Sequence, residues 1–103
     1  MKKIEKLSNK IEKEIESAYE YAKCALDTKE TDPAIAEVYY KIATNRLNDM
    51  GALHTQVVEV INEYRKEHGE PPESMKMLYD ILHKKHIESA AAVKGMLALY
   101  KEP

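Results

Sequence analysis

An acidic residue and two histidines recur at intervals of three in the segment Asp80-x-x-His83-x-x-His86. On a helix this spacing places the three side chains within about 120° of arc on one face. His54 stands at a similar height if its segment forms a neighbouring helix that runs in the opposite direction. Zinc takes four nitrogen or oxygen ligands, and carboxylates together with imidazoles also suit iron. The sequence therefore predicts a metal site on these four residues, with zinc as the expected ion and iron as the alternative.

Polar residues also interrupt the apolar stripes of the two earlier segments. In the second segment the core-facing positions fall on Asn45 or Arg46 and then on Asp49, and in the first segment Glu14 stands beside Ile15. Charged groups in a core must be paired, hydrogen-bonded or bound to metal, so Asp49 and Glu14 are further candidate ligands. The alternative is an ordinary solvated face, with exposed histidines and an Arg46–Asp49 ion pair one turn apart.

Composition limits the classes of protein that the chain can belong to. Its 103 residues allow one domain with a modest core, and 44% hydrophobic and 33% charged residues are typical of a globular chain. The net charge of −2, from 16 basic and 18 acidic residues, argues against a nucleic-acid binder and against a mimic of DNA. Cys24 stands alone, which suits a reducing cytoplasm, and no apolar run approaches the ~18 residues of a membrane span.

Apolar residues at steps of three and four predict three long helices. The first stripe consists of Ile4, Leu7, Ile11, Ile15, Ala18, Ala22 and Ala25. Asp32-Pro33 is a typical helix start, because the carboxylate can cap the free N–H groups and proline suits the first position. Gly69 and Pro71-Pro72 end the second helix. Short connections make neighbouring helices antiparallel, so we expect one domain over residues 1–103, an elongated antiparallel three-helix bundle with helices at about 4–28, 33–68 and 73–101.

The sequence contains no recognisable catalytic constellation. It has no glycine-rich phosphate loop, no Cys-x-x-Cys pair and no serine or cysteine in a nucleophile motif. All aromatic rings are tyrosines, of which Tyr19, Tyr39 and Tyr40 are expected on long helix faces that a partner protein or a second copy of the chain could cover. The alternative is that these rings line the edges of the bundle.

Several segments resemble a family of small ferritin-like helical proteins found in prophages of Gram-positive gut bacteria. The resemblance covers nearly the whole chain. It rests on Leu7-Ser8-Asn9-Lys10-Ile11-Glu12, Tyr21-Ala22-Lys23-Cys24-Ala25-Leu26, Leu53-His54, Ile61-Asn62-Glu63-Tyr64-Arg65, Gly69-Glu70-Pro71-Pro72 and Leu82-His83-Lys84-Lys85-His86-Ile87-Glu88. None of these segments is a catalytic signature.

The resemblance implies a ferritin-like bundle in which Glu-x-x-His motifs hold metal. The family's motif on the second helix falls at Arg46-x-x-Asp49 here, where a cationic side chain would repel a metal ion. This departure argues against a di-iron oxidase. Asp80-x-x-His83 keeps the acid-then-histidine form, and His54 and His86 match the family's pattern, so a single structural zinc ion is implied.

The prophage resemblance also implies a function. Small prophage accessory proteins include anti-CRISPR proteins, which bind a host nuclease such as Cas9 and inhibit it. We therefore expect a phage-encoded inhibitor that docks on a protein in the bacterial cytoplasm, without direct contact to nucleic acid or membrane. Two alternatives stay open: a ferritin-like protein that binds or oxidises iron, and a structural phage module that assembles as a homodimer or larger oligomer.

Overall fold

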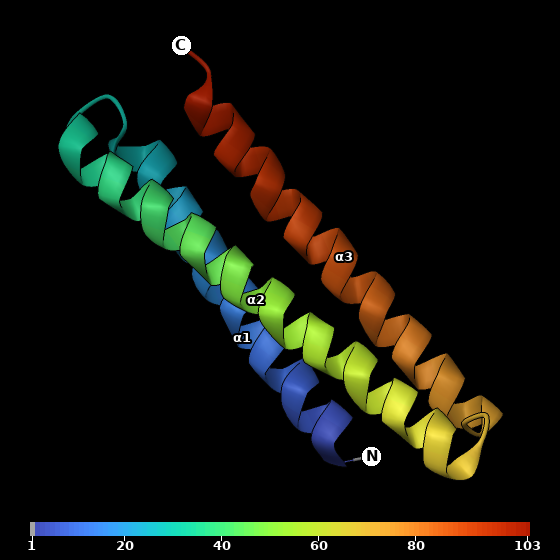
Figure 1. Cartoon of the computed structure of the whole chain (residues 1–103). Coiled ribbons are helices and arrows are strands. Elements are labelled where there is room, and N and C mark those ends of the chain that lie inside the picture. Colours follow the sequence, from blue (N-terminus) through green and yellow to red (C-terminus); the bar gives the residue numbers. More distant parts are fainter. Residues whose placement is uncertain (1) are drawn as a thin grey trace.

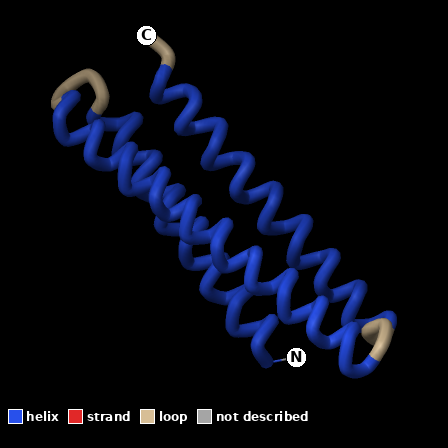
Figure 2. Tube along the Cα trace, viewed as in Figure 1, coloured by secondary structure: helices blue, strands red, loops and turns tan. Residues whose placement is uncertain are grey.

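Three long helices make up the structure, a computed structural model that describes residues 2–103. They are α1 (Lys2–Thr28), α2 (Pro33–His68) and α3 (Glu73–Lys101), and no strand occurs in this range. Figure 2 shows that the remaining backbone is confined to two short connections and the C-terminal end. The helices lie side by side in an elongated bundle of 56 × 18 × 17 Å. None of the helices in the described range is long and apolar enough to cross a membrane.

The chain reverses direction at both connections. Figure 1 shows the N-terminus at the end of the molecule where α2 joins α3, and the C-terminus at the end where α1 joins α2. Asp32 caps α2, because its Oδ1 accepts a hydrogen bond from the N–H of Ile35 at 3.2 Å. At the other end of α2, Gly69 has φ +77°, a left-handed conformation that glycine adopts without strain, and its N–H donates to the carbonyl of Arg65 at 2.9 Å.

A heptad-like stripe on α1 forms one side of the core. Its buried positions alternate in steps of four and three and consist of Ile4, Ser8, Ile11, Ile15, Ala18, Ala22 and Ala25. The sequence analysis placed Leu7 in this stripe, but Leu7 lies at the edge of the core and Ser8 takes the buried position. At about 100° per residue, positions 7 and 8 lie at similar angles on opposite sides of Ile11, so the rotation of α1 against its neighbours decides which of them is buried.

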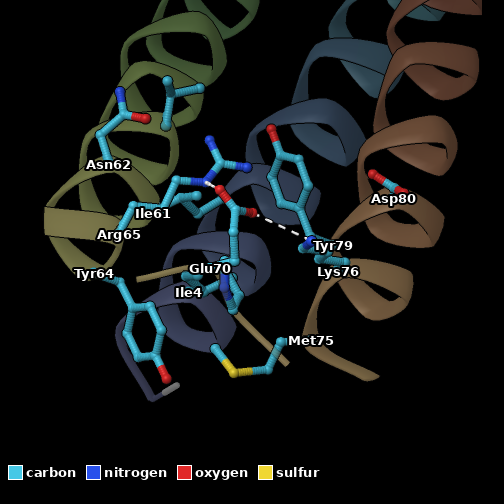
Figure 3. Close-up of a pocket in the computed structure, with 12 residues that line it drawn as sticks. Ile4, Ile61, Asn62, Tyr64, Arg65, Glu70, Met75, Lys76, Tyr79 and Asp80 are labelled. Atoms are coloured by element: carbon cyan, nitrogen blue, oxygen red, sulfur yellow. Dashed lines mark ion pairs between the residues drawn. The ribbon is translucent and has the colours of Figure 1, made fainter. Parts of the chain in front are cut away.

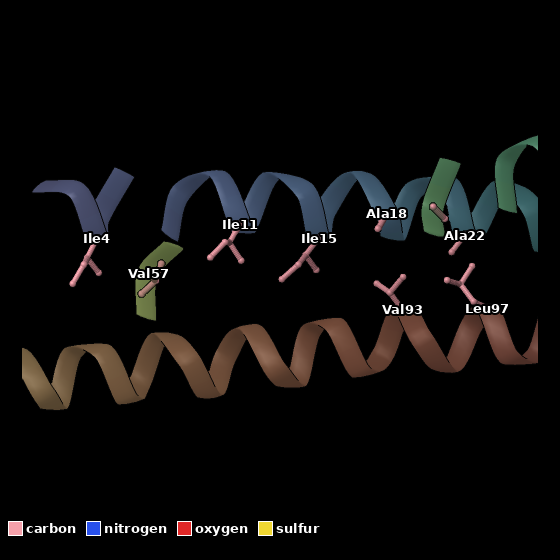
Figure 4. Close-up of a cluster of buried hydrophobic side chains, with 9 residues drawn as sticks. Ile4, Ile11, Ile15, Ala18, Ala22, Val57, Val93 and Leu97 are labelled. Carbon is pink, nitrogen blue, oxygen red and sulfur yellow. The ribbon is translucent and has the colours of Figure 1, made fainter. Parts of the chain in front are cut away.

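Small residues let α1 and α2 approach each other closely near their connection. Ala18, Ala22, Ala25, Ala36 and Ala43 are all almost completely buried. The third helix packs mainly on α1 and touches α2 little. In Figure 4, the α3 members of the main core cluster, Val93 and Leu97, lie towards the C-terminal half of α3. Further towards its N-terminus, α3 buries His86 instead of an apolar residue.

Candidate functional site

A cluster of polar side chains replaces the apolar core near the middle of the bundle. We call it the histidine layer; it consists of Ser8 and Glu12 from α1, His54 from α2, and His83 and His86 from α3. Ser8 and the three imidazoles line one cavity of about 10 Å³, together with Ile11, Val57, Tyr79 and Leu82. That volume is about the minimum for a single water molecule or a metal ion. The three imidazoles also line a second, half-open cavity of about 340 Å³.

Two of the imidazoles contact each other across the α2–α3 boundary. Nε2 of His54 lies 2.8 Å from Nδ1 of His83, and the ring centroids are 4.7 Å apart. One nitrogen must carry the proton and the other must accept it, so the two facing nitrogens cannot both be protonated. Burial lowers the pKa of His54, and the positive charge of protonated His83 lowers it further. The neutral form of His54, which is the form that binds metal ions, is therefore favoured.

His83 is held from its other side by an aromatic ring. Tyr79, one turn earlier on α3, stacks on it with the centroids 5.4 Å apart. Burial and the negative charge of Asp80 raise the pKa of Tyr79, so the phenol stays neutral beside the imidazoles. The stack limits rotation of the His83 ring and aims its Nδ1 at α2.

His86 is the most deeply buried member of the layer, with 6% of its surface exposed. Its Nε2 has no hydrogen-bond partner within residues 2–103, although Oε1 of Glu12 lies 3.7 Å away. Burial lowers the pKa of His86 and outweighs Glu12, which raises it. Lys85 also pairs with the same oxygen of Glu12 at 3.4 Å. A buried polar atom without a hydrogen bond costs about 1–3 kcal/mol, and Oε2 of Glu14 and Nε of Arg46 are in the same position elsewhere in the described chain.

The geometry brings together only part of the predicted metal site. His54, His83 and His86 share the cavity, but no three His, Cys, Asp or Glu side chains of the described chain are arranged to hold a metal ion. Two nitrogen ligands of a tetrahedral zinc ion lie about 3.3 Å apart, so the His54–His83 pair would have to open by about 0.5 Å. His86 would bring its unpaired Nε2, and Glu12 would offer a carboxylate beside it.

The carboxylates predicted as ligands lie elsewhere. Asp80 is exposed and lines a different, larger cavity at the α2–α3 connection. Glu14 and Asp49 both pair with Arg46, at 3.7 Å to Nε and 3.2 Å to Nη2 respectively. The sequence analysis offered this ion pair as the alternative to metal binding, and for Asp49 the structure has that arrangement. Arg46 therefore pairs with both carboxylates, and neither of them lines the cavity of the histidine layer.

Sequence reasoning missed the two α1 members of the layer. Ser8 follows Ile4 by four residues and Glu12 follows Ser8 by four, so both lie on or beside the buried seam of α1. A strict alternation of steps of four and three would have placed Ser8 in the core. Glu12 carried no such signal, because it stands next to Ile11 and its proximity to His86 depends on how α1 packs on α3.

No model of a known protein family, no curated protein and no solved structure matches the chain significantly. What the histidine layer and the helix faces bind must therefore be argued from their own chemistry.

Proposed function

We propose that this protein is a non-catalytic binding protein that docks on a protein partner through the outer face of α3. The observation that carries the proposal is a group of three large apolar side chains left in solvent, Met77, Leu78 and Ile81, which are 57%, 49% and 63% exposed. Their spacing places them within about 100° of arc on one side of the helix, opposite the buried residues. Neighbouring exposed apolar side chains on a helix are the usual anchors of a protein interface.

The charge of the chain favours a protein as the partner. With 16 basic and 18 acidic residues it lacks the excess of cations that a nucleic-acid binder needs. The resemblance to small prophage proteins extends the proposal to a specific partner, a host Cas9-type nuclease, which the chain would inhibit. An inhibitor of nearly balanced charge would block such a nuclease by covering a domain of it, rather than by imitating DNA.

A cleavage assay tests this proposal. Purified Cas9 with guide RNA would be titrated with the intact protein, and we expect cleavage of target DNA to fall to background at stoichiometric excess. The variant Ile81→Glu should abolish the inhibition, because it places a charge in the centre of the apolar group. Ile35→Glu is the matched control, since Ile35 is similarly exposed, at 47%, but lies on α2. Unchanged cleavage at excess protein would contradict the inhibitor proposal.

We include a structural zinc ion in the same proposal. His54, His83 and His86 would hold it, with Glu12 as the fourth donor, and it would join all three helices at the histidine layer. The support is the unpaired Nε2 of buried His86 and the convergence of three imidazoles from two helices on one cavity. When bound, zinc would supply cross-linking between the helices.

The finer description of the fold, an antiparallel and ferritin-like bundle, belongs to this proposal as well. The positions of the termini in Figure 1 support the antiparallel order. The ferritin-like alternative function, iron binding or oxidation, requires carboxylates that are free to bridge two ions. Glu14 and Asp49 are instead paired with Arg46, so the geometry favours a single-ion structural site over an iron-oxidising one.

A further inference from the structure

A concave site with both apolar and charged walls lies where α2 ends and α3 begins, apart from the histidine layer. It is a half-open cavity of about 330 Å³, drawn in Figure 3. We propose that this cavity binds a small monocarboxylate with an unbranched aliphatic chain. Its volume falls in the range of about 300–1,000 Å³ that is typical of small-molecule sites.

The wall of the cavity is mainly apolar. The side chains that form it are Ile4 from α1, Val58 and Ile61 from α2, Pro71 from the connection, and Met75 and Tyr79 from α3. Val58 is itself left partly in solvent, at 38% exposure. Because the wall draws on every helix, it would surround a flexible hydrocarbon chain from several sides. Methionine and aliphatic side chains adapt to such a chain better than to a rigid planar ligand.

Two cations stand at the mouth of the cavity and already share one carboxylate. Oε1 of Glu70 lies 3.6 Å from Nε of Arg65, and its Oε2 lies 3.2 Å from Nζ of Lys76. Figure 3 shows the Glu70 side chain between the other two, with one ion pair on each side. The position of a bound carboxylate is therefore occupied by a side chain of the protein itself.

Glu70 can leave this position at little cost. Its side chain is 66% exposed, and ion pairs at such exposure contribute little stability. It follows Gly69 directly in the α2–α3 connection, outside both helices, so no helical packing holds it. A ligand carboxylate would replace the Glu70 carboxylate between Arg65 and Lys76.

The remaining charges select for a single negative charge. Once Glu70 has moved out, the cavity is lined by two cations, Arg65 and Lys76, and one anion, Asp80. The balance is one positive charge, which matches a monoanion. A dicarboxylate or a phosphate dianion would meet Asp80 with an unbalanced charge.

Calorimetric titration of the full chain with butanoate, hexanoate, octanoate and decanoate, each below its micelle concentration, tests the proposal. We expect saturable binding of one ligand per chain that tightens about fourfold per added methylene until the cavity is filled. Arg65→Gln and Lys76→Gln should each weaken binding about fivefold, because a partly exposed charge-assisted contact is lost. Glu70→Gln should instead tighten binding, because the competing carboxylate is removed.

Matched controls separate a site from general adsorption. Glu67→Gln removes a similarly exposed carboxylate that does not line the cavity, and it should leave the affinity unchanged. Octanol, which has the chain without the charge, should bind at least fivefold more weakly than octanoate. Equal binding of octanol and octanoate, no dependence on Arg65, or weaker binding by Glu70→Gln would each overturn the proposal, as would the absence of saturable binding. Circular dichroism of each variant excludes loss of fold as the cause.

Discussion

The two halves of the bundle differ in what fills the space between the helices. Near the α1–α2 connection the filling is Ala25 and Ala36, closed off by the ring of Tyr100, which stacks on Tyr40 with the centroids 4.8 Å apart. The hydroxyl of Tyr100 donates to Oε2 of Glu37 at 3.0 Å. We call this region the alanine–tyrosine end. In the histidine layer, by contrast, three imidazoles take the place of apolar side chains, and Nε2 of His86 forms no hydrogen bond in the described chain.

The comparison indicates that the alanine–tyrosine end contributes more to the stability of the fold than the histidine layer does. At the alanine–tyrosine end, small residues allow close helix contact and the buried hydroxyl is satisfied. The histidine layer gives up apolar burial, and Nε2 of His86 has no hydrogen bond, only an ion pair with Glu12 at 3.7 Å. A chain that needed only to fold would place a leucine at such a position. We propose that the residue types of this layer are explained by binding.

The largest expected effect comes from overfilling the alanine–tyrosine end. Ala36→Leu should lower the free energy of unfolding by about 1–3 kcal/mol or more, because a completely buried position has no room for three further carbons. Ala34→Leu, at an exposed position two residues earlier on the same helix, should change it by no more than about 0.5 kcal/mol. Urea denaturation measures both. Equal tolerance of the two variants would mean that this end is loosely packed.

Lowering the pH below about 6.5 should destabilise the metal-free protein by protonating histidines of the histidine layer. The pKa values of His54 and His86 are lowered in the folded state, so below the ordinary histidine pKa of about 6.5 the unfolded chain binds protons that the folded chain does not. Stability is therefore full above pH 6.5 and is lost as the pH falls from there towards the lowered values, by at most about 1.4 kcal/mol per pH unit for each histidine. Melting temperatures between pH 8 and pH 5 check the direction, and a rise in stability towards pH 5 would refute it.

Replacing the buried histidine should stabilise the metal-free protein. His86→Leu removes the unpaired Nε2 and should raise the free energy of unfolding by about 1 kcal/mol. His68→Leu, at the exposed end of α2, is the control and should change it little. A loss of stability in His86→Leu would show that Glu12 and His86 form a stabilising pair, and would contradict the claim that buried His86 destabilises the metal-free fold.

The smallest effect is expected at Ser8. Both Ser8→Ala and Ser17→Ala gain about 0.5 kcal/mol of helix propensity on α1. Ser8 also lies in the buried seam of the histidine layer, so its substitution should stabilise the chain more than that of Ser17, which is only half-buried. Thermal melts of the two variants measure this difference. A larger increase in melting temperature for Ser17→Ala than for Ser8→Ala would argue against a destabilising histidine layer.

Periodicity and capping residues predicted the helices well, because these signals are local. The structure starts α2 at Pro33 and α3 at Glu73, and α1 begins two residues before the expected Ile4. The predicted metal ligands agree less well with the structure, because which side chains converge depends on how each helix is rotated about its own axis. His54, His83 and His86 line one cavity, whereas Asp80 is exposed at another cavity. Spacing within α2 already offered the Arg46–Asp49 pair, but the positions of Glu12 beside His86 and of Glu14 beside Arg46 depend on contacts between helices.

Titration of the metal-free chain with zinc, followed by calorimetry and by the melting temperature, tests the role of the histidine layer most directly. We predict one ion per chain, a melting temperature that rises with the zinc concentration, and loss of both effects in His83→Ala, while His68→Ala behaves like the unaltered protein. Absence of zinc binding, or identical binding by His83→Ala, would contradict the claim that the three imidazoles are held together in the bundle to bind a metal ion.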